Sequence, residues 1–470
     1  MQPSLERANR GRRISLPTPY SPFPLFLGLL PMSKQYTRIL LFAATLLGLG
    51  LITTQGALAG ELRQQNHTKQ LVEGLYTNNL DAATYFQQGV TQYNRSEFQA
   101  AELAFRKALQ FDPYMPMARY LLGNALFQQG RFDVAAEQYQ FALDLDPNMA
   151  EAHYNLGLML YQQGKTDEAI SAYQRAIALN TNLPAARYNL GLAFESKGQV
   201  EDALTQYTEA IRLDPNLARA QYNLGLLLAK QNQPASAITA LQQAVQTNPE
   251  FVPAHYQLGL LLVQQNQKEA AKTSFMTAAK LDSKFAPAHY QLGLIFAEQG
   301  DLKEAIRRFE WVTKIEPNNV EAYRQLGATL TKNGEYERAS VALKRAVELD
   351  PYEALTHYNL AVALHRSQQY QPAIAEYQEA ILLNPKLSLA FYNMGVALHQ
   401  SGRSAEAVSF LLEARNLFAQ EGNLEKIDEV DKFLQQINAT PPPAAQPAPP
   451  AFQAPPFNPF RIRQSSSEVR

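Results

Sequence analysis

The chain has 470 residues, no cysteine and seven histidines, and its 42 Lys and Arg against 43 Asp and Glu give a formal net charge of -1. The lack of cysteine excludes disulfides, thiolate nucleophiles and Cys-ligated metal centres, and the charge balance gives no electrostatic reason to expect a nucleic-acid or membrane-surface binder. Apolar residues make up 46% of the chain, within the globular range, so most of it can fold.

Residues 32–59 have the three-part layout of a secretory signal peptide. Lys34 and Arg38 form a basic start, residues 39–52 are apolar, and small residues lead up to Ala59. The apolar run is shorter than the ~20 residues that a membrane-spanning helix needs, so we expect cleavage after Ala59 and export to a periplasmic or equivalent compartment. The alternative is a membrane anchor formed by residues 39–52.

Residues 1–31 precede this signal and contain four arginines but a single acidic residue. Prolines at positions 17, 19, 22, 24 and 31 interrupt any helix there. We expect translation to start at Met32, and a basic, acid-poor transit-like extension is the alternative. Residues 60–81 are expected to form a short lead-in to the next region.

The sequence from residue 82 to residue 421 repeats itself every 34 residues, ten times, without insertion or deletion. The units begin at residues 82, 116, 150, 184, 218, 252, 286, 320, 354 and 388. Position 8 of the unit is Gly in nine units, position 20 is Ala in all ten, and position 32 is Pro in seven. This pattern, which covers 340 of 470 residues, resembles the tetratricopeptide repeat family.

Each unit is expected to form two helices joined by a turn. Small residues such as Gly157 and Ala169 let the two helices cross closely, and Gly164 ends the first helix. Proline at position 32 ends the second helix because it cannot donate the required hydrogen bond. One pair cannot bury its apolar face alone, so neighbouring units stack. The resemblance implies an all-α fold, a right-handed superhelical solenoid of ten helix-turn-helix repeats.

The segments after the last repeat are predicted to differ from it. Residues 422–438 place apolar side chains on one helical face and charged side chains on the other, which is typical of a C-terminal capping helix. Residues 439–470 are rich in proline and are expected to be a disordered tail.

The resemblance implies that positions 2, 5, 6, 9, 12 and 13 of each unit line a concave groove. Position 5 is aromatic in nine units and position 6 is Asn or Gln in nine. Side-chain amides match the C=O and N–H groups of an extended peptide, and this row is similar to the asparagine ladder of the O-linked N-acetylglucosamine transferases. The alternative is that these residues are common in the family even where no peptide is held. The predicted peptide groove consists of Tyr154, Asn155, Tyr188, Asn189, Tyr222, Asn223, Tyr256, Gln257, Tyr290, Gln291, Tyr358, Asn359, Tyr392 and Asn393.

The first three units carry aromatic residues at both position 5 and position 12. A surface of this kind can dock proline-rich or aromatic-bearing segments, and the protein's own tail is one candidate. The predicted aromatic patch consists of Phe86, Tyr93, Tyr120, Phe127, Tyr154 and Tyr161.

The remaining motifs favour a binding protein over an enzyme. No G-x-S-x-G, P-loop or H-E-x-x-H motif occurs, and uninterrupted repeats leave no inserted loop for a catalytic site. Groove charges are sparse, which disfavours nucleic acid, and His365 with His399 lacks the carboxylate that a metal site would need, so we expect no metal and no cofactor.

We therefore predict a non-enzymatic scaffold that binds an extended segment of another protein, in the assembly or biogenesis of an envelope or membrane complex. A self-associating structural repeat protein and a targeting or regulatory subunit of a separate enzyme are the alternatives, although the sequence makes no strong case for a homo-oligomer. Membrane contact is expected only through the N-terminal segment, if it is not cleaved.

Overall fold

The computed structural model describes residues 77–439, and in this range it contains helices and no strand. The predictions for residues 1–76, including the signal peptide and cleavage after Ala59, lie outside the described residues, as does the tail from residue 440 onward. Among the described helices, none combines the length and the apolar character needed to cross a membrane.

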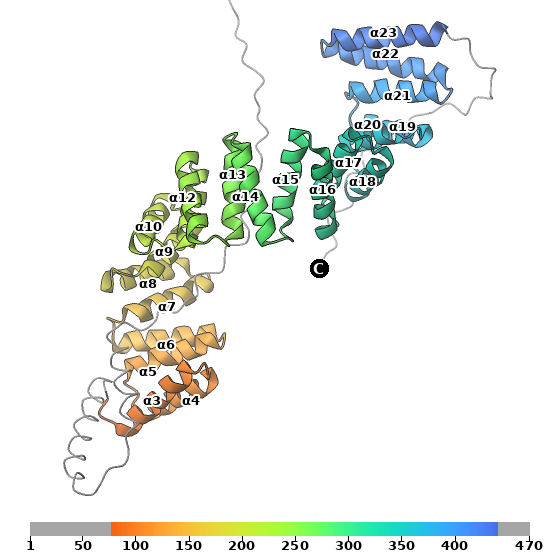
Figure 1. Ribbon diagram of the computed structural model, residues 1–470. Helices are drawn as coiled ribbons and strands as arrows, with labels where there is room; N and C mark the ends of the chain where they lie inside the picture. Colours follow the sequence, from red (N-terminus) through yellow and green to blue (C-terminus); the bar gives the residue numbers. More distant parts are fainter. Residues whose placement is uncertain (1–76, 440–470) are drawn as a thin grey trace, which may run out of the picture. The chain divides into compact units, whose positions relative to one another are not determined.

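First and second helices of successive units alternate along the chain (Figure 1). Their bounds are α3 Leu80–Asn94, α4 Phe98–Phe111, α5 Pro116–Gln128, α6 Phe132–Leu145, α7 Ala150–Gln162, α8 Thr166–Leu179, α9 Pro184–Ser196, α10 Val200–Leu213, α11 Ala218–Lys230, α12 Pro234–Thr247, α13 Val252–Gln264, α14 Lys268–Leu281, α15 Ala286–Gln299, α16 Leu302–Ile315, α17 Val320–Lys332, α18 Tyr336–Leu349, α19 Ala354–Arg366, α20 Tyr370–Leu383, α21 Ser388–Gln400, α22 Ser404–Gln420 and α23 Leu424–Ala439.

The helix boundaries follow the 34-residue period. From α5 to α21, every first helix begins at the residue where a repeat begins, whereas α3 begins slightly earlier, at Leu80. The predicted all-α solenoid class is confirmed. The chain divides into two compact units, one ending at Ser274 and one beginning at Phe275, and each is described by itself.

The turn between the two helices of each repeat depends on a single left-handed residue at position 15. All ten of these residues have positive φ, although only six of them are glycine. Left-handed backbone costs a residue with a Cβ roughly 1–2 kcal/mol, and Asn tolerates it better than most. The ten residues are Ser96, Gly130, Gly164, Gly198, Asn232, Asn266, Gly300, Gly334, Gln368 and Gly402.

The two helices of a repeat approach closely where an aromatic ring or a leucine of the second helix lies against the position-8 glycine of the first. In the third repeat a Cβ on Gly157 would lie 2.6 Å from the Tyr173 ring, and Tyr173 is fully buried. The ring of Tyr154, from the first helix, packs on Tyr173 with centroids 6.1 Å apart. The core of the first unit runs continuously through such contacts from Ala82 to Leu227.

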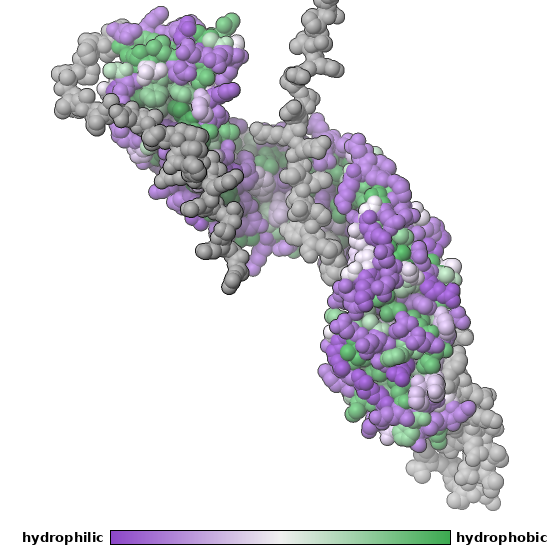
Figure 2. Space-filling model, turned by 180° about the vertical axis from the view of Figure 1, so that it is seen from behind, coloured by the Kyte–Doolittle hydropathy of each residue, from purple (hydrophilic) through white to green (hydrophobic). Residues whose placement is uncertain are grey.

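The surface between these contacts is mixed in character. Figure 2 shows hydrophobic residues scattered in small groups among hydrophilic ones on the face that it displays. The second unit ends with α23, which buries Val430 and Ile437 in the same core as Leu411 of α22. A hydrogen-bonded ion pair between Arg415 and Asp431, 2.7 Å long, joins the two helices.

We predict that Gln368→Gly stabilises the protein, because the native φ of 63° is strained for a residue with a Cβ. The gain should be about 1 kcal/mol, measured as the free energy of unfolding in urea. Gln369→Gly is the matched control, since Gln369 has a φ of -88° and should lose about 0.5–1 kcal/mol from added chain entropy. Equal effects of the two substitutions would contradict the strain at the turn.

Candidate functional site

The aromatic side chains at position 5 are largely core residues. Phe86, Tyr120, Tyr154, Tyr188, Tyr222 and Tyr256 in the first unit are all at most 5% exposed. In the second unit Tyr290, Tyr358 and Tyr392 are half-buried. Each ring is enclosed because the first helix of a repeat packs against both its own second helix and the neighbouring repeat.

The hydroxyl of the position-5 tyrosine accepts a hydrogen bond from the position-6 asparagine of the next repeat. We call these contacts the tyrosine–asparagine pairs. The Nδ2 of Asn donates to the Oη of Tyr in Asn155–Tyr120 at 3.4 Å, Asn189–Tyr154 at 3.1 Å, Asn223–Tyr188 at 3.3 Å and Asn393–Tyr358 at 2.9 Å. The row of amides thus joins adjacent first helices by side-chain chemistry.

Two junctions lack the tyrosine of this pair, and they do so in different ways. Phe86 has no hydroxyl, and the residue that would face it from the next repeat is Leu121 rather than an amide. Both side chains are buried in the core of the first unit. Arg324 replaces the position-5 aromatic residue in the eighth repeat, where its guanidinium donates to Thr356 at 2.8 Å and to Asp350 at 2.6 Å.

These contacts correct the expected location of several predicted groove residues. Asn155 and Asn189 have no exposed surface, and Asn223 is 8% exposed. In the described structure these amides serve the neighbouring repeat and offer no surface to a peptide. Gln257, Gln291, Asn359 and Asn393 remain half-exposed. Peptide binding along the row stays a prediction, and only the half-exposed members have surface available for it.

The predicted aromatic patch is corrected in the same way. Phe86, Tyr120 and Tyr154 are buried against the second helices of their repeats, and Phe127 is 8% exposed. Only Tyr93 and Tyr161 are half-buried. The aromatic residues of the first three repeats therefore contribute mainly to the core, with two rings accessible at position 12.

The accessible part of the first-helix face is an apolar strip at position 9. In the first unit Leu192, Leu226 and Leu260 lie on α9, α11 and α13 and are half-buried. Adjacent first helices contact each other directly, as α7 does with α9 and α11 with α13. We define Leu192, Leu226 and Leu260 as the leucine strip. The equivalent positions of the second unit hold half-buried Leu294, Val362 and Val396.

Polar contacts between repeats also border this strip at positions 12 and 13. In the first unit Glu195 accepts from Lys230 at 2.9 Å, and the buried Tyr207 hydroxyl donates to the same carboxylate at 2.9 Å. In the second unit His365 and Gln400 are 2.7 Å apart in equivalent positions. The strip therefore lies between two polar rows, the tyrosine–asparagine pairs on one side and these contacts on the other.

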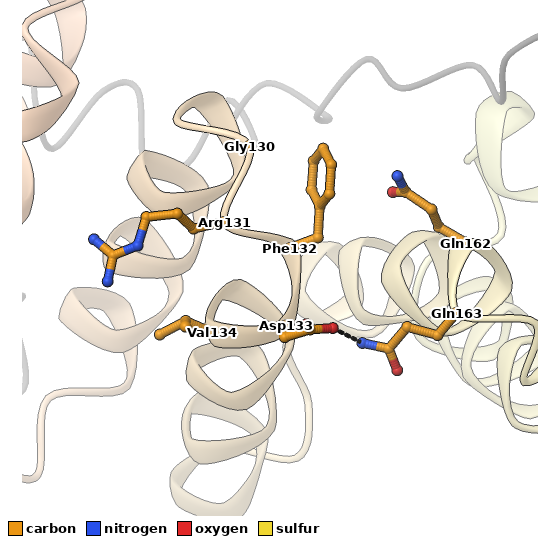
Figure 3. A pocket seen from close by; sticks show the side chains of 7 residues that line it. All are labelled: Gly130, Arg131, Phe132, Asp133, Val134, Gln162 and Gln163. Carbon is orange, nitrogen blue, oxygen red and sulfur yellow. Dashed lines mark hydrogen bonds between the residues drawn. The ribbon is translucent and has the colours of Figure 1, made fainter.

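A shallow pocket lies at the turn edge of the second and third repeats (Figure 3). Phe132 and Gln162 extend side by side in the view, and Gln163 donates to Asp133 at 2.9 Å. The same link between successive repeats recurs where Gln231 donates to Glu201 at 2.7 Å. The polar residues of this pocket thus connect repeats.

The histidines act in packing and hydrogen bonding. His153, His255 and His357, all at position 4, bind the backbone carbonyl of a proline in the preceding turn. A hydrogen bond with Glu376 raises the pKa of His357, whereas burial lowers the pKa of His153. Within residues 77–439 no group of three His, Asp or Glu side chains is arranged to hold a metal ion.

Family models identify the class of protein that these repeats form. Tetratricopeptide repeat models match residues 120–184 and 228–293, and a TPR repeat model matches residues 194–232, 293–334, 329–368 and 363–402. Together they cover more than half of the chain, which belongs to the tetratricopeptide repeat family. Proteins of this family generally bind other proteins or peptides. No curated protein matches the chain.

Solved structures with similar repeats each match part of the chain. MamA is 30% identical, with a TM-score of 0.33 over 34% of this chain and 95% of its own. YrrB, described as a TPR protein with an unusual peptide-binding site, is 24% identical, with a TM-score of 0.36 over 40% of this chain and 96% of its own. The C-terminal part of a TPR repeat-containing protein from Cytophaga hutchinsonii is 15% identical, with a TM-score of 0.45 over 51% of this chain and 99% of its own.

We predict that Tyr154→Phe destabilises the protein by about 1 kcal/mol, because the buried Asn189 amide loses one of its two acceptors and keeps only the Ala185 carbonyl. Combining it with Asn189→Leu should cost less than the sum of the two single substitutions, with a coupling of about 1 kcal/mol in urea unfolding. Tyr173→Phe is the control, since the buried Tyr173 hydroxyl has no hydrogen-bond partner among the described residues. It should be close to neutral, and an absent coupling between Tyr154 and Asn189 would refute the pairing.

Proposed function

We propose that the protein is an exported, non-enzymatic scaffold that holds an extended segment of another polypeptide along its first-helix face. The setting that we propose is the assembly or biogenesis of an envelope or membrane complex. Membership of the tetratricopeptide repeat family supports protein binding in general. The observation that carries the groove itself is the leucine strip, which is the accessible apolar surface between two polar rows.

The geometry supports this role in physical terms. Leu192, Leu226 and Leu260 recur at intervals of 34 residues, so a ligand that crosses successive repeats meets an apolar contact at each one. The half-exposed amide of Gln257 offers one acceptor and two donors beside the strip. Apolar contact with adaptable amides suits a polypeptide in extended conformation better than a small, highly charged ligand.

We expect a photocrosslinking residue at position 226, in place of Leu226, to capture one discrete partner in the native cell. Leu226 is half-buried on α11 and lies in the middle of the leucine strip. Mass spectrometry of the adduct would identify the partner. The crosslinker replaces a side chain that faces the groove, so the fold of the repeat is retained.

Thr205 provides the matched control for this experiment, since it is exposed on α10, the second helix of the preceding repeat. A crosslinker at position 205 should give no discrete adduct. Equal adducts from the two positions, or no adduct from position 226, would argue against binding along the first-helix face.

Export is proposed from the basic, apolar and small-residue segments of residues 32–59. We expect the mature protein to begin at Gly60, as determined by mass spectrometry of its N-terminal peptide after purification from the native cell. Ala59→Leu should block cleavage and leave the chain attached to the membrane. A mature protein that retains residues 39–52 would instead support the membrane-anchored alternative.

A further inference from the structure

The first-helix face of the first unit has few charged side chains, and two of them neutralise each other. At the six groove positions the unit carries Glu151, Glu195, Arg219 and Lys230. Lys230 and Glu195 form an ion pair with a distance of 2.9 Å. Glu151 and Arg219 are therefore the two charges on this face that a ligand can meet uncompensated.

Glu151 and Arg219 occupy the same position of their repeats. Each is the second residue of a first helix, Glu151 on α7 and Arg219 on α11. The equivalent residue of α9, which lies between them in sequence, is Ala185 and carries no charge. Arg219 is exposed and Glu151 is half-buried, and neither makes an ion pair with any described residue.

Both charges lie beside tyrosine–asparagine pairs. Burial raises the pKa of the Tyr188 hydroxyl to about 12, and the nearby Arg219 charge opposes this rise. Burial also raises the pKa of Tyr120, and the Glu151 carboxylate adds to that effect. The two charges thus have equivalent surroundings and opposite signs, two repeats apart along one face.

We propose that Glu151 and Arg219 set the register and direction of the bound segment by pairing with a basic and an acidic side chain of the partner. This inference rests on the proposed function. Neighbouring helices pack about 10 Å apart, so two repeats separate the charges by about 20 Å. An extended chain advances about 3.3 Å per residue, and the two partner charges are therefore about six residues apart. An apolar residue between them faces the half-buried Leu192.

The test uses fluorescein-labelled peptides of Leu, Ala and Ser that carry one Lys and one Glu about six residues apart, in both chain orders. A control peptide has the same composition with Lys and Glu adjacent. In fluorescence anisotropy the full-length protein should bind one order of the spaced peptide about tenfold more tightly than the control. Arg219→Glu should remove this preference.

The double variant Glu151→Lys with Arg219→Glu supplies the decisive comparison, since it should prefer the opposite chain order of the same spaced peptides. Arg219 is exposed and Glu151 is half-buried, so we expect the circular-dichroism melting curve to stay close to that of the unsubstituted protein. Equal binding of spaced and adjacent charges, no binding of any peptide, or an unchanged preference in the double variant would overturn the proposal. A discrete crosslink from position 226 together with any of these results would leave groove binding intact and refute only the charge register.

Discussion

The structure depends on burying each first helix between its own second helix and the neighbouring repeat. The isolated pair cannot supply this burial, because the position-5 ring that packs on Tyr173 in the third repeat also reaches the next repeat through its hydroxyl. Apolar burial provides the driving force, while the tyrosine–asparagine pairs satisfy polar groups that burial would otherwise leave without partners. The side chains at positions 5 and 6 therefore hold successive repeats together. Their 34-residue periodicity is also what made the sequence predict a row of ligand contacts.

Sequence periodicity predicts what is local and repeated. The helix boundaries and the turn residues follow from the 34-residue pattern, and even Ser96 and Gln368 take the backbone conformation expected from glycine in other repeats. Burial at positions 5 and 6 could not be predicted in the same way. Whether Asn189 faces a ligand or the adjacent repeat depends on the distance between the two repeats. The residue pattern within one repeat does not determine that distance. A sequence signal did exist at one junction, because Phe86, which lacks a hydroxyl, is followed one repeat later by Leu121, which lacks an amide. Arg324 breaks the aromatic row without such a change, since Asn359 follows it.

The accessible surface of the first helices in the first unit consequently carries fewer amides and aromatic rings than the sequence suggests. Three of the nine position-6 amides and six of the nine position-5 aromatic rings are buried, and in the first unit the leucine strip remains accessible with a border of polar side chains. Under the proposed function, an apolar strip of this kind would offer similar contacts to many extended segments. Discrimination between segments would then come from the few residues that differ between repeats, which in the first unit include the charges at position 2. Under the proposed function, contacts common to all repeats and contacts specific to one repeat would therefore both arise from units that are alike at most positions and differ at a few.

The tyrosine–asparagine pairs are also directional, because their donor and acceptor come from different sides of each junction. At the four junctions with a tyrosine–asparagine pair, the earlier repeat presents the acceptor and the later repeat presents the donor, so all four pairs have the same direction along the chain. At the last repeat no further asparagine follows, and the Tyr392 hydroxyl instead donates to Glu429 of α23 at 2.8 Å. The Glu429 carboxylate of the terminal helix thus takes the place at this hydroxyl that the asparagine of a further repeat would occupy. Duplication of a unit that carries both the tyrosine and the asparagine would create a further junction of the same chemistry, whereas duplication of the unit that contains Arg324 would not.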